Sequence, residues 1–222
     1  MYTAVAIDGP AGAGKSTISR AVAKRLGFIY VDTGALYRTV ALAAKRQEIK
    51  PVESKEIEEF LKTITVELTF DDNHTQIVLL NGENVSSLIR TPEISMMASA
   101  VSAIPCVRAF LLDLQRDMAK KHDVIMDGRD IATVVLPNAQ VKIFLTAAAD
   151  IRAKRRYDEL VQNGTQVKYE DVLQDVKLRD NNDSNRKIAP LKPAEESVIV
   201  DTSDLSFEQS VERIISVIEE KK

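Results

Sequence analysis

Alternating blocks of hydrophobic and polar residues predict a chain in which strands and helices follow one another. Short apolar runs at 3–7 and 28–31 are typical of buried strands, and each precedes a segment with helical spacing of apolar residues, at 17–26 and 35–45. This βαβα order predicts an α/β protein with a parallel sheet. Ligands of such sheets bind beyond the carboxyl ends of the strands, so the residues that follow each strand are candidates for a site.

The hydrophobic pattern changes between residues 65 and 85. Apolar and polar residues alternate over 66–70, the segment 76–80 is apolar, and Asn81-Gly82 is a strong signal for a hairpin turn. This pattern favours a small antiparallel sheet inserted into the α/β scaffold. Such an insert can carry a second substrate, although the pattern supports a purely structural hairpin nearly as well.

Helical and strand patterns both continue in the second half of the chain. The polar segment 179–186 indicates turns. The other elements expected there are helices at 92–104, 107–120 and 169–178, strands at 123–127, 141–146 and 197–201, a helix capped by Asp150, and a last helix that begins with the capping box Ser206-Phe-Glu-Gln209.

The segment between the first predicted strand and helix fits the phosphate-binding loop pattern of Gly, four residues, Gly, Lys and Ser or Thr. Its glycines allow backbone N–H groups to turn toward phosphate oxygens, and the helix directs the positive end of its dipole at the same anion. Lys15 would reach the β- and γ-phosphates, and the Ser16 hydroxyl would join a magnesium shell. We therefore predict a bound nucleoside triphosphate. The residues expected to contact it are Gly9, Pro10, Ala11, Gly12, Ala13, Gly14, Lys15, Ser16 and Thr17.

Charged residues follow two of the predicted strands. One strand ends in Asp127, which would help to hold magnesium directly or through water, as the second nucleotide-binding motif of phosphate-loop proteins does. Arg129 and Asp130 come directly after it, where ligand contacts are expected. Thr33 and Arg38 follow the second strand of the chain and could line the same site; an exposed helix start is the alternative interpretation.

A second group of cations occupies one predicted helix. Arg152, Lys154, Arg155 and Arg156 place four positive charges within five residues, and these repel one another unless an anion joins them. The usual interpretation is a solvated helix face. In a nucleotide-binding protein, such a cluster also indicates a movable lid whose arginines neutralise charge in the transition state.

Composition limits the kinds of protein that this chain can be. The 222 residues, 45% hydrophobic and 28% charged, can bury the core of one soluble domain. A net charge of -3 gives no electrostatic case for binding a nucleic-acid polymer or an anionic membrane. The longest uncharged run, 94–107, is too short to span a bilayer, and no targeting segment is recognisable, so we expect a cytoplasmic protein. The single cysteine, Cys106, is expected to have a packing role.

Two functions from different classes fit a phosphate loop: a kinase for a small phosphorylated acceptor, and a GTPase-like switch that acts by binding. The chain lacks the Asn-Lys-x-Asp motif that reads guanine, and it lacks the His-Arg-Asp loop of protein kinases. It has instead an excess of arginine at strand ends and loops, at Arg38, Arg129, Arg179 and Arg186. An acceptor that is already a phosphate needs no general base, but it needs cations to bring two anions together.

At these residues the chain resembles the bacterial cytidylate kinases, over nearly its full length. Thr33 stands where some members have Ser, and Ala132 stands where Gly is usual. The motifs that carry the resemblance are Asp8-Gly-Pro-Ala-Gly-Ala-Gly-Lys-Ser16, Asp32-Thr-Gly-Ala-Leu-Tyr-Arg38, the helix from Ser99 to Arg108, Met126-Asp-Gly-Arg-Asp130, and Arg179-Asp-x-x-Asp183-x-x-Arg186 followed by Ala189-Pro-Leu191.

The resemblance implies one nucleoside monophosphate kinase domain over 1–222, with a five-stranded parallel core at 1–64, 105–150 and 169–222. A monophosphate-binding insert at about 65–104 and a lid at about 151–168 would complete it. The implied reaction transfers the γ-phosphoryl group of ATP, with Mg²⁺, to CMP or dCMP in a monomeric enzyme. The implied contacts are Ser99, Arg108 and Asp130 with cytosine, Arg179 and Asp183 with the ribose, and Arg38, Arg129 and Arg186 with the acceptor phosphate, while Lys15, Arg129, Arg152, Arg155, Arg156 and Arg186 would assist the transfer.

Overall fold

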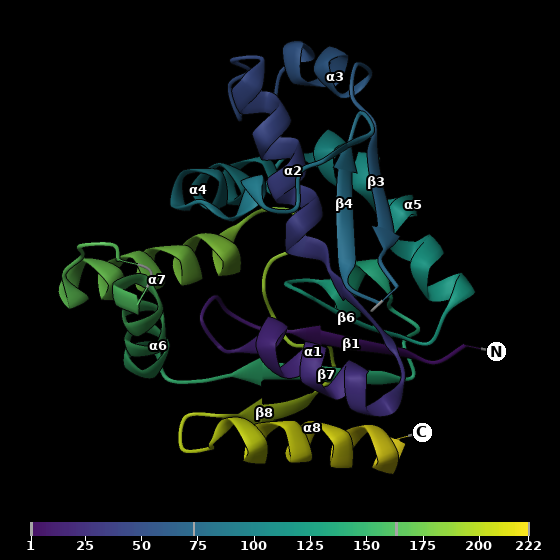
Figure 1. The fold of residues 1–222 in the computed structure, drawn as a ribbon, viewed down its shortest axis with the longest axis vertical. Coiled ribbons are helices and arrows are strands. Elements are labelled where there is room, and N and C mark those ends of the chain that lie inside the picture. Colours follow the sequence, from purple (N-terminus) through teal and green to yellow (C-terminus); the bar gives the residue numbers. More distant parts are fainter. Residues whose placement is uncertain (1, 73, 163, 222) are drawn as a thin grey trace. The chain divides into compact units, whose positions relative to one another are not determined.

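The computed structural model describes residues 2–72, 74–162 and 164–221, and the chain forms two compact units (Figure 1). One unit comprises Met1–Tyr2 and Ile29–Val124, and the other comprises Thr3–Phe28 together with Ile125–Lys222. The predicted division into core, insert and lid stays a prediction.

Five strands form a parallel sheet in the order β2-β6-β1-β7-β8. Strand β1 is central and all its residues are buried, with Ile7 opposite Ile143 of β7. Apolar residues on both faces suit a sheet that is covered by helices on both sides. The predicted α/β fold class with a parallel sheet is therefore confirmed. The strands are β1 (Ala4–Asp8), β2 (Ile29–Asp32), β6 (Val124–Gly128), β7 (Val141–Thr146) and β8 (Val198–Asp201).

Helix α8 (Phe207–Lys221) lies along β7 and β8 and also packs against α1 (Lys15–Leu26), as Figure 1 shows. It begins with the expected capping box: the Ser206 amide donates to Gln209 Oε1 at 2.9 Å, and the Gln209 amide donates to Ser206 Oγ at 3.1 Å. These two bonds satisfy amides that a helix start otherwise leaves unpaired.

Helices α6 (Ala149–Gln162) and α7 (Tyr169–Asn185) pack against each other in the same unit. The prediction that α7 ends at about residue 178 was wrong. Its last residues are Asp, Asn and Ser, which favour turns in isolation, but burial of Val172 and Val176 against α6 and of Asp183 stabilises the helix to Asn185.

Two further local expectations need correction in this unit. Asp150 does not precede α6; it lies inside the first turn, because the helix begins one residue earlier. Directly after Asp130 the chain forms a π-helical turn at Ile131–Val135, which the hydrophobic pattern did not predict. Such turns often lie at functional sites.

The Ile29–Val124 unit contains the predicted antiparallel sheet. Its strands are β3 (Val66–Phe70), β4 (Gln76–Leu80) and β5 (Glu83–Asn84), in that order. Asn81 and Gly82 have φ of 51° and 81°, as a type I′ hairpin turn requires. The turn expected from the Asn-Gly pair is therefore confirmed.

Helix α2 (Thr33–Arg46) is central to this unit and packs against β4, α4 (Pro92–Val101) and α5 (Pro105–Lys121). Helix α3 (Lys55–Leu61), which is capped by the Ser54 side chain, was not predicted from the sequence pattern. No single helix in the described ranges is long and apolar enough to cross a membrane. Helices α4 and α5 together have the length and the apolar composition of a membrane span, but the pair is bent by 100°. A 3-10 turn, η1 (Leu88–Arg90), comes between β5 and α4 in the chain.

Candidate active site

The loop from Gly9 to Gly14 joins β1 to α1, so the strand, loop and helix expected of a phosphate site are in place. Gly9 has a φ of 151°, and a Cβ there would lie 1.9 Å from the carbonyl oxygen of Leu145 in β7. Gly14 is left-handed, with φ 84°, and no side chain of the described residues caps α1. The first amides of α1 therefore remain available to an anion, as in other helix-terminal phosphate sites.

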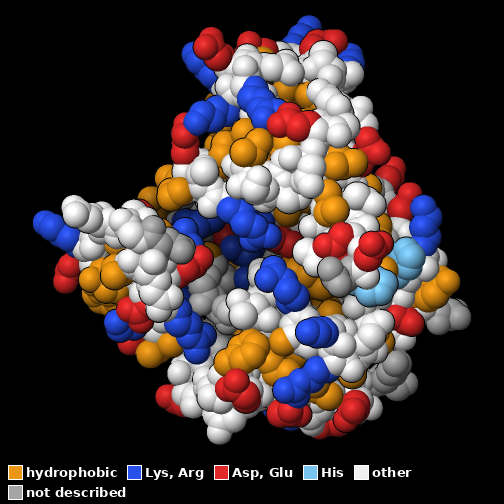
Figure 2. All heavy atoms as spheres, in the orientation of Figure 1, with side chains coloured by type: hydrophobic (Ala, Val, Ile, Leu, Met, Phe, Trp, Pro, Cys, Tyr) orange, Lys and Arg blue, Asp and Glu red, His pale blue; other side chains and the backbone are white. Residues whose placement is uncertain are grey.

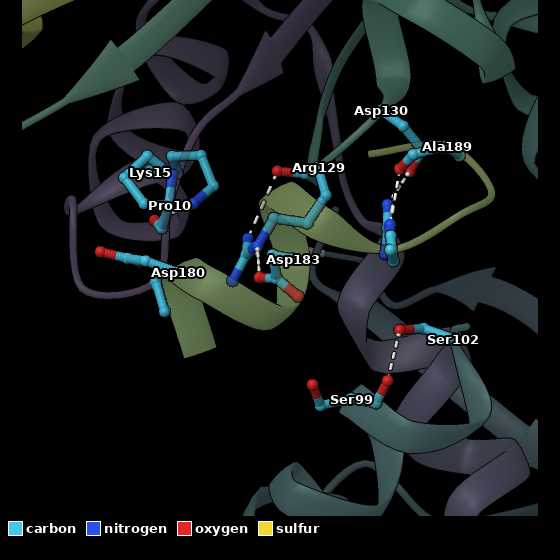
Figure 3. A network of polar contacts seen from close by, with 12 residues as sticks. Pro10, Lys15, Ser99, Ser102, Arg129, Asp130, Asp180, Asp183 and Ala189 are labelled. Atoms are coloured by element: carbon cyan, nitrogen blue, oxygen red, sulfur yellow. Dashed lines mark hydrogen bonds and ion pairs between the residues drawn. The ribbon is translucent and has the colours of Figure 1, made fainter. Parts of the chain in front are cut away.

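Lys15 is buried, and its Nζ donates to the Pro10 carbonyl at 2.7 Å (Figure 3). Burial and the nearby Arg129 guanidinium lower the Lys15 pKa below its usual range, while Asp127, Asp8 and Asp183 oppose that shift. A bound phosphate would add negative charge beside this buried cation and would oppose the lowering of its pKa further.

Ser16 and Asp127 hold two oxygen ligands close together. The Ser16 hydroxyl donates to Asp127 Oδ2 at 2.8 Å, and Asp127 is 3% exposed at the end of β6. Oxygen ligands of this kind suit Mg²⁺, which takes only one or two protein ligands when phosphates supply others. The described residues contain no group of three or more His, Cys, Asp or Glu side chains that could hold a metal by themselves.

Asp8, the last residue of β1, fixes the turn that follows β6. Its two carboxylate oxygens accept hydrogen bonds from the amides of Ile131 and Ala132, at 2.7 and 2.8 Å. Burial raises the Asp8 pKa to about 6, the two amide bonds oppose that rise, and the Asp130 carboxylate adds to it. Asp8 thus holds the backbone directly after Arg129 and Asp130.

Two ion pairs connect the β6 end with the α7 region (Figure 3). Arg129 Nε donates to Asp183 Oδ2 at 2.8 Å, and Arg186 Nη2 lies 3.5 Å from Asp130 Oδ1. Arg186 Nε also donates to the Ala189 carbonyl at 2.5 Å. The structure therefore brings together four residues that the resemblance assigns to the acceptor nucleotide, from segments far apart in sequence.

The cations of the expected lid each have a partner within the protein. Arg152 is 5% exposed and forms an ion pair with Asp180, and Arg155 donates to the backbone and side-chain oxygens of Thr202. The side chains of Lys154 and Arg156 pair with carboxylates on the same helix. Three of these four cations thus face a carboxylate and Arg155 faces neutral oxygens, and a role of the arginines in the transition state stays a prediction.

In the Ile29–Val124 unit, Asp32 caps α2 and holds two arginines. Its Oδ1 accepts from the Ala35 amide at 3.0 Å, and its Oδ2 lies 2.8 Å from Arg38 Nη2 and 3.6 Å from Arg90 Nη2. The Gln76 side chain of β4 bonds the Asp32 backbone amide and carbonyl, at 2.7 and 3.1 Å. The antiparallel sheet therefore holds the end of β2 directly. Thr33, the first residue of α2, is buried beside Asp32.

Arg108 and Ser99 belong to the same unit. Arg108 of α5 is 8% exposed, donates to the Ser102 carbonyl at 3.0 Å, and lies 5.7 Å from the centre of the Tyr37 ring. The Ser99 carbonyl of α4 accepts from Ser102 Oγ at 2.9 Å (Figure 3). Stacking on Tyr37 restricts the orientation of the Arg108 guanidinium.

Several residues of the site carried no assigned role in the sequence analysis. Asp8 and Asp180 stood inside quoted motifs, but only tertiary contacts reveal what they hold. Gln76 and Arg90 gave no signal, because their partner Asp32 is remote in sequence. Asp180 and Asp183 lie one turn apart on α7, but this spacing does not indicate which residue Asp180 holds.

The face drawn in Figure 2 carries basic and acidic side chains interspersed, in keeping with 30 basic and 33 acidic residues. Positive and negative side chains on that face therefore lie near one another (Figure 2). The ion pairs described above are the clearest cases within each unit.

Comparison with solved structures supports the fold. A shikimate kinase from Bacteroides thetaiotaomicron superimposes with a TM-score of 0.50 at 12% identity, covering 98% of each chain. An uncharacterized protein from Eubacterium ventriosum gives a TM-score of 0.52 at 13% identity, covering 99% of each chain. At such identities the likeness extends to the fold alone.

Comparison of sequences is more specific. A family model described as cytidylate kinase matches residues 5–220. A cytidylate kinase from Caldicellulosiruptor bescii is 49% identical over 213 residues, which cover 96% of this chain and 94% of the relative. One from Thermosipho melanesiensis is 46% identical over 221 residues, which cover 100% and 99%. The resemblance found in the sequence motifs is thereby confirmed, and the chain belongs to the cytidylate kinase family.

Proposed function

We propose that this protein is a cytidylate kinase, which transfers the γ-phosphoryl group of ATP to CMP or dCMP and forms CDP or dCDP in pyrimidine nucleotide metabolism. The observation that carries the proposal is the site at the ends of β1 and β6, in a chain of this family. There a buried Lys15 and the paired Ser16 and Asp127 lie in the same unit as Arg129 and Asp130.

On the donor side, the Gly9–Ser16 loop would surround the ATP phosphates with backbone amides. Lys15 would neutralise charge on the β- and γ-phosphates as the transferred group moves. Ser16 and Asp127 would hold Mg²⁺, which supplies further neutralisation of the phosphate oxygens when it is bound.

On the acceptor side, the arginines would bind and orient the monophosphate. Arg38 supports this role, because its Nε is buried without a hydrogen-bond partner in the described part of the chain and so offers a charged donor to a ligand. Arg129 and Arg186 already face carboxylates, which the acceptor phosphate would replace or share. The contacts of Ser99, Arg108 and Asp130 with cytosine, and of Arg179 and Asp183 with the ribose, stay predictions.

The deciding experiment measures ADP formation from Mg-ATP with CMP, dCMP, UMP, AMP and GMP separately, and with no acceptor. We expect turnover with CMP and dCMP, and little with the others. Lys15→Ala is the matched control and should lose most of the turnover, since it removes a transition-state cation. ADP release that needs no acceptor would overturn the proposal in favour of an ATPase or a switch.

Base choice offers a sharper test. Cytosine presents an amino donor and a ring-nitrogen acceptor, whereas uracil presents an acceptor and a donor at these two positions. A carboxylate and an arginine, here Asp130 and Arg108, can therefore discriminate between the two bases. Each reversed contact costs about 1–3 kcal/mol, which predicts discrimination against UMP of roughly a hundredfold or more. We expect Asp130→Asn to lose CMP activity and to narrow the CMP/UMP ratio of kcat/KM by about tenfold.

The competing role for Asp130 is to hold Arg186, whose Nη2 lies 3.5 Å from its carboxylate. Loss of activity on both bases in equal proportion would assign Asp130 to that role and move base recognition elsewhere.

We also propose that the enzyme acts as a cytoplasmic monomer and binds neither nucleic acid nor membrane. Sedimentation velocity across a concentration series tests whether the protein stays monomeric.

A further inference from the structure

One guanidinium, that of Arg152 at the start of α6, connects three segments of the Thr3–Phe28 and Ile125–Lys222 unit. Its Nε donates to the Ala147 carbonyl at 2.7 Å, and its Nη1 donates to the Ala11 carbonyl of the phosphate loop at 3.0 Å. Nη1 and Nη2 also bond the two carboxylate oxygens of Asp180, at 3.0 and 2.6 Å. The side chain of Arg152 is 6% exposed, so the charge is almost entirely enclosed by these oxygens.

The loop also fits closely against the backbone of Arg152. A Cβ at Gly12 would lie 3.1 Å from both the Cβ and the carbonyl oxygen of Arg152. Gly12 is left-handed, with φ 76°. The phosphate loop and the first turn of α6 therefore leave no space for a side chain between them, and the position of Arg152 limits the positions open to the loop.

Asp180 is the residue that brings a second helix into this arrangement. It lies on α7, between Arg179 and Asp183, which the resemblance assigns to the ribose, and Figure 3 shows Asp180 and Asp183 on the same helix. Asp183 in turn holds Arg129 at 2.8 Å. Helix α7 thus carries two of the proposed acceptor residues, Arg179 and Asp183, and through Asp180 and Arg152 it is bonded to the backbone of the proposed donor loop.

We propose that Asp180 is a positioning residue: it fixes Arg152 on the phosphate loop and thereby couples ATP binding at that loop to acceptor binding on α7. The inference rests on the proposed function for the identity of the two ligands. Without Asp180 a buried guanidinium loses its only carboxylate among the described contacts, so the loop is held less firmly and must be ordered when ATP binds.

The test compares Asp180→Asn with Asp175→Asn, which removes one carboxylate from an exposed position of the same helix. Asparagine keeps the shape of Asp180 but loses the charge and one acceptor oxygen. We expect Asp180→Asn to weaken Mg-ATP binding about tenfold and to speed amide hydrogen exchange in the Gly9–Ser16 loop, with Asp175→Asn like the wild type in both.

Coupling is measured as the ratio of CMP dissociation constants without and with a non-hydrolysable ATP analogue. In the wild type the analogue should tighten CMP binding on the order of fivefold, and in Asp180→Asn the ratio should approach one. A cycle with Arg152→Met should be non-additive, so that the double variant binds ATP no worse than either single variant.

The proposal is overturned if Asp180→Asn shows the same amide hydrogen exchange in the loop and the same ATP affinity as the wild type, or if its kcat rises. A rise would mean that Asp180 holds Arg152 back from the phosphates. Loop exchange and ATP affinity do not depend on the acceptor, so they judge the role of Asp180 even if CMP proves not to be the substrate. A wild type that turns over ATP without CMP would contradict the proposed function alone.

Discussion

Asp8 illustrates how a single buried carboxylate can fix the backbone of a site. Both of its oxygens accept hydrogen bonds from amides of the turn after Asp130, while burial of the carboxyl opposes its ionisation. An asparagine could accept one of the two bonds but would direct an N–H group at the other amide. The charge of Asp8 is therefore tied to the geometry that follows β6.

This predicts a specific pH dependence of stability. The Asp8 pKa is about 6 in the folded protein and 3.8 in its reference state, so its contribution to stability is complete below pH 3.8 and is lost as the pH rises through 6. Relative to Asp8→Asn, the free energy of unfolding of the wild type should fall by roughly 1–1.5 kcal/mol between about pH 5 and pH 7.5.

Urea unfolding at several pH values measures this difference. Asp72→Asn, which removes an exposed carboxylate from the β3–β4 turn, controls for the loss of one negative charge. Parallel pH profiles for Asp8→Asn and the wild type would show that Asp8 keeps its ordinary pKa in the folded protein.

Among the helices, α5 contains an unusual buried residue. Gln115 is 1% exposed on the apolar face that also carries Leu111 and Met118, and neither end of its amide has a hydrogen-bond partner among the residues described. Burying an amide without such a bond costs about 1–3 kcal/mol, so Gln115 should destabilise the Ile29–Val124 unit.

Replacing Gln115 with Met keeps the side-chain length and removes the unpaired amide. We expect Gln115→Met to raise the Tm by about 2–4 °C, which corresponds to roughly 1 kcal/mol in a chain of this size. Gln115→Ala is the control and should lower the Tm, because it leaves a cavity. A lower Tm for Gln115→Met as well would mean that the Gln115 amide has a hydrogen-bond partner in the wild type, such as a bound water.

The elements also show what the hydrophobic pattern can and cannot predict. Most strands and helices were predicted to within a few residues, because their buried apolar residues recur with the spacing of a strand or a helix. The end of α7 was not predicted, since Asp183 is buried by a tertiary ion pair with Arg129 and not by an apolar stripe. The π-helical turn after Asp130 depends likewise on Asp8, more than a hundred residues earlier in the chain.

The same distinction applies to the candidate site. Motif spacing placed Lys15, Ser16 and Asp127 in one site, because the ends of neighbouring parallel strands meet at one edge of a sheet. It could not identify Asp180 or Gln76, whose roles come from partners on other elements. Residues that bind a ligand directly leave a motif, whereas the residues that position them are recognised only once the chain is folded.

At the scale of the whole molecule, a ligand that binds the folded chain and not the unfolded one should stabilise the protein by mass action. A ligand at about a hundred times its dissociation constant adds about 2.7 kcal/mol to the free energy of unfolding. We expect Mg-ADP and CMP each to raise the Tm by roughly 5–10 °C at that concentration.

Thermal unfolding with UMP in place of CMP gives the control for the base, and Lys15→Ala gives the control for the donor. That variant should lose the shift with Mg-ADP and keep the shift with CMP. A UMP shift as large as that of CMP would contradict the proposed base selectivity.

The space around Gly9 limits which substitutions the gene can carry at that codon. A side chain there would overlap the Leu145 carbonyl of the neighbouring strand, whereas a Cβ at Gly27 or Gly82 meets no atom within 4 Å. Positions 27 and 82 still need a left-handed backbone, which asparagine tolerates. In a library of single substitutions we expect codon 9 to accept no replacement, alanine included, while codons 27 and 82 retain function with asparagine.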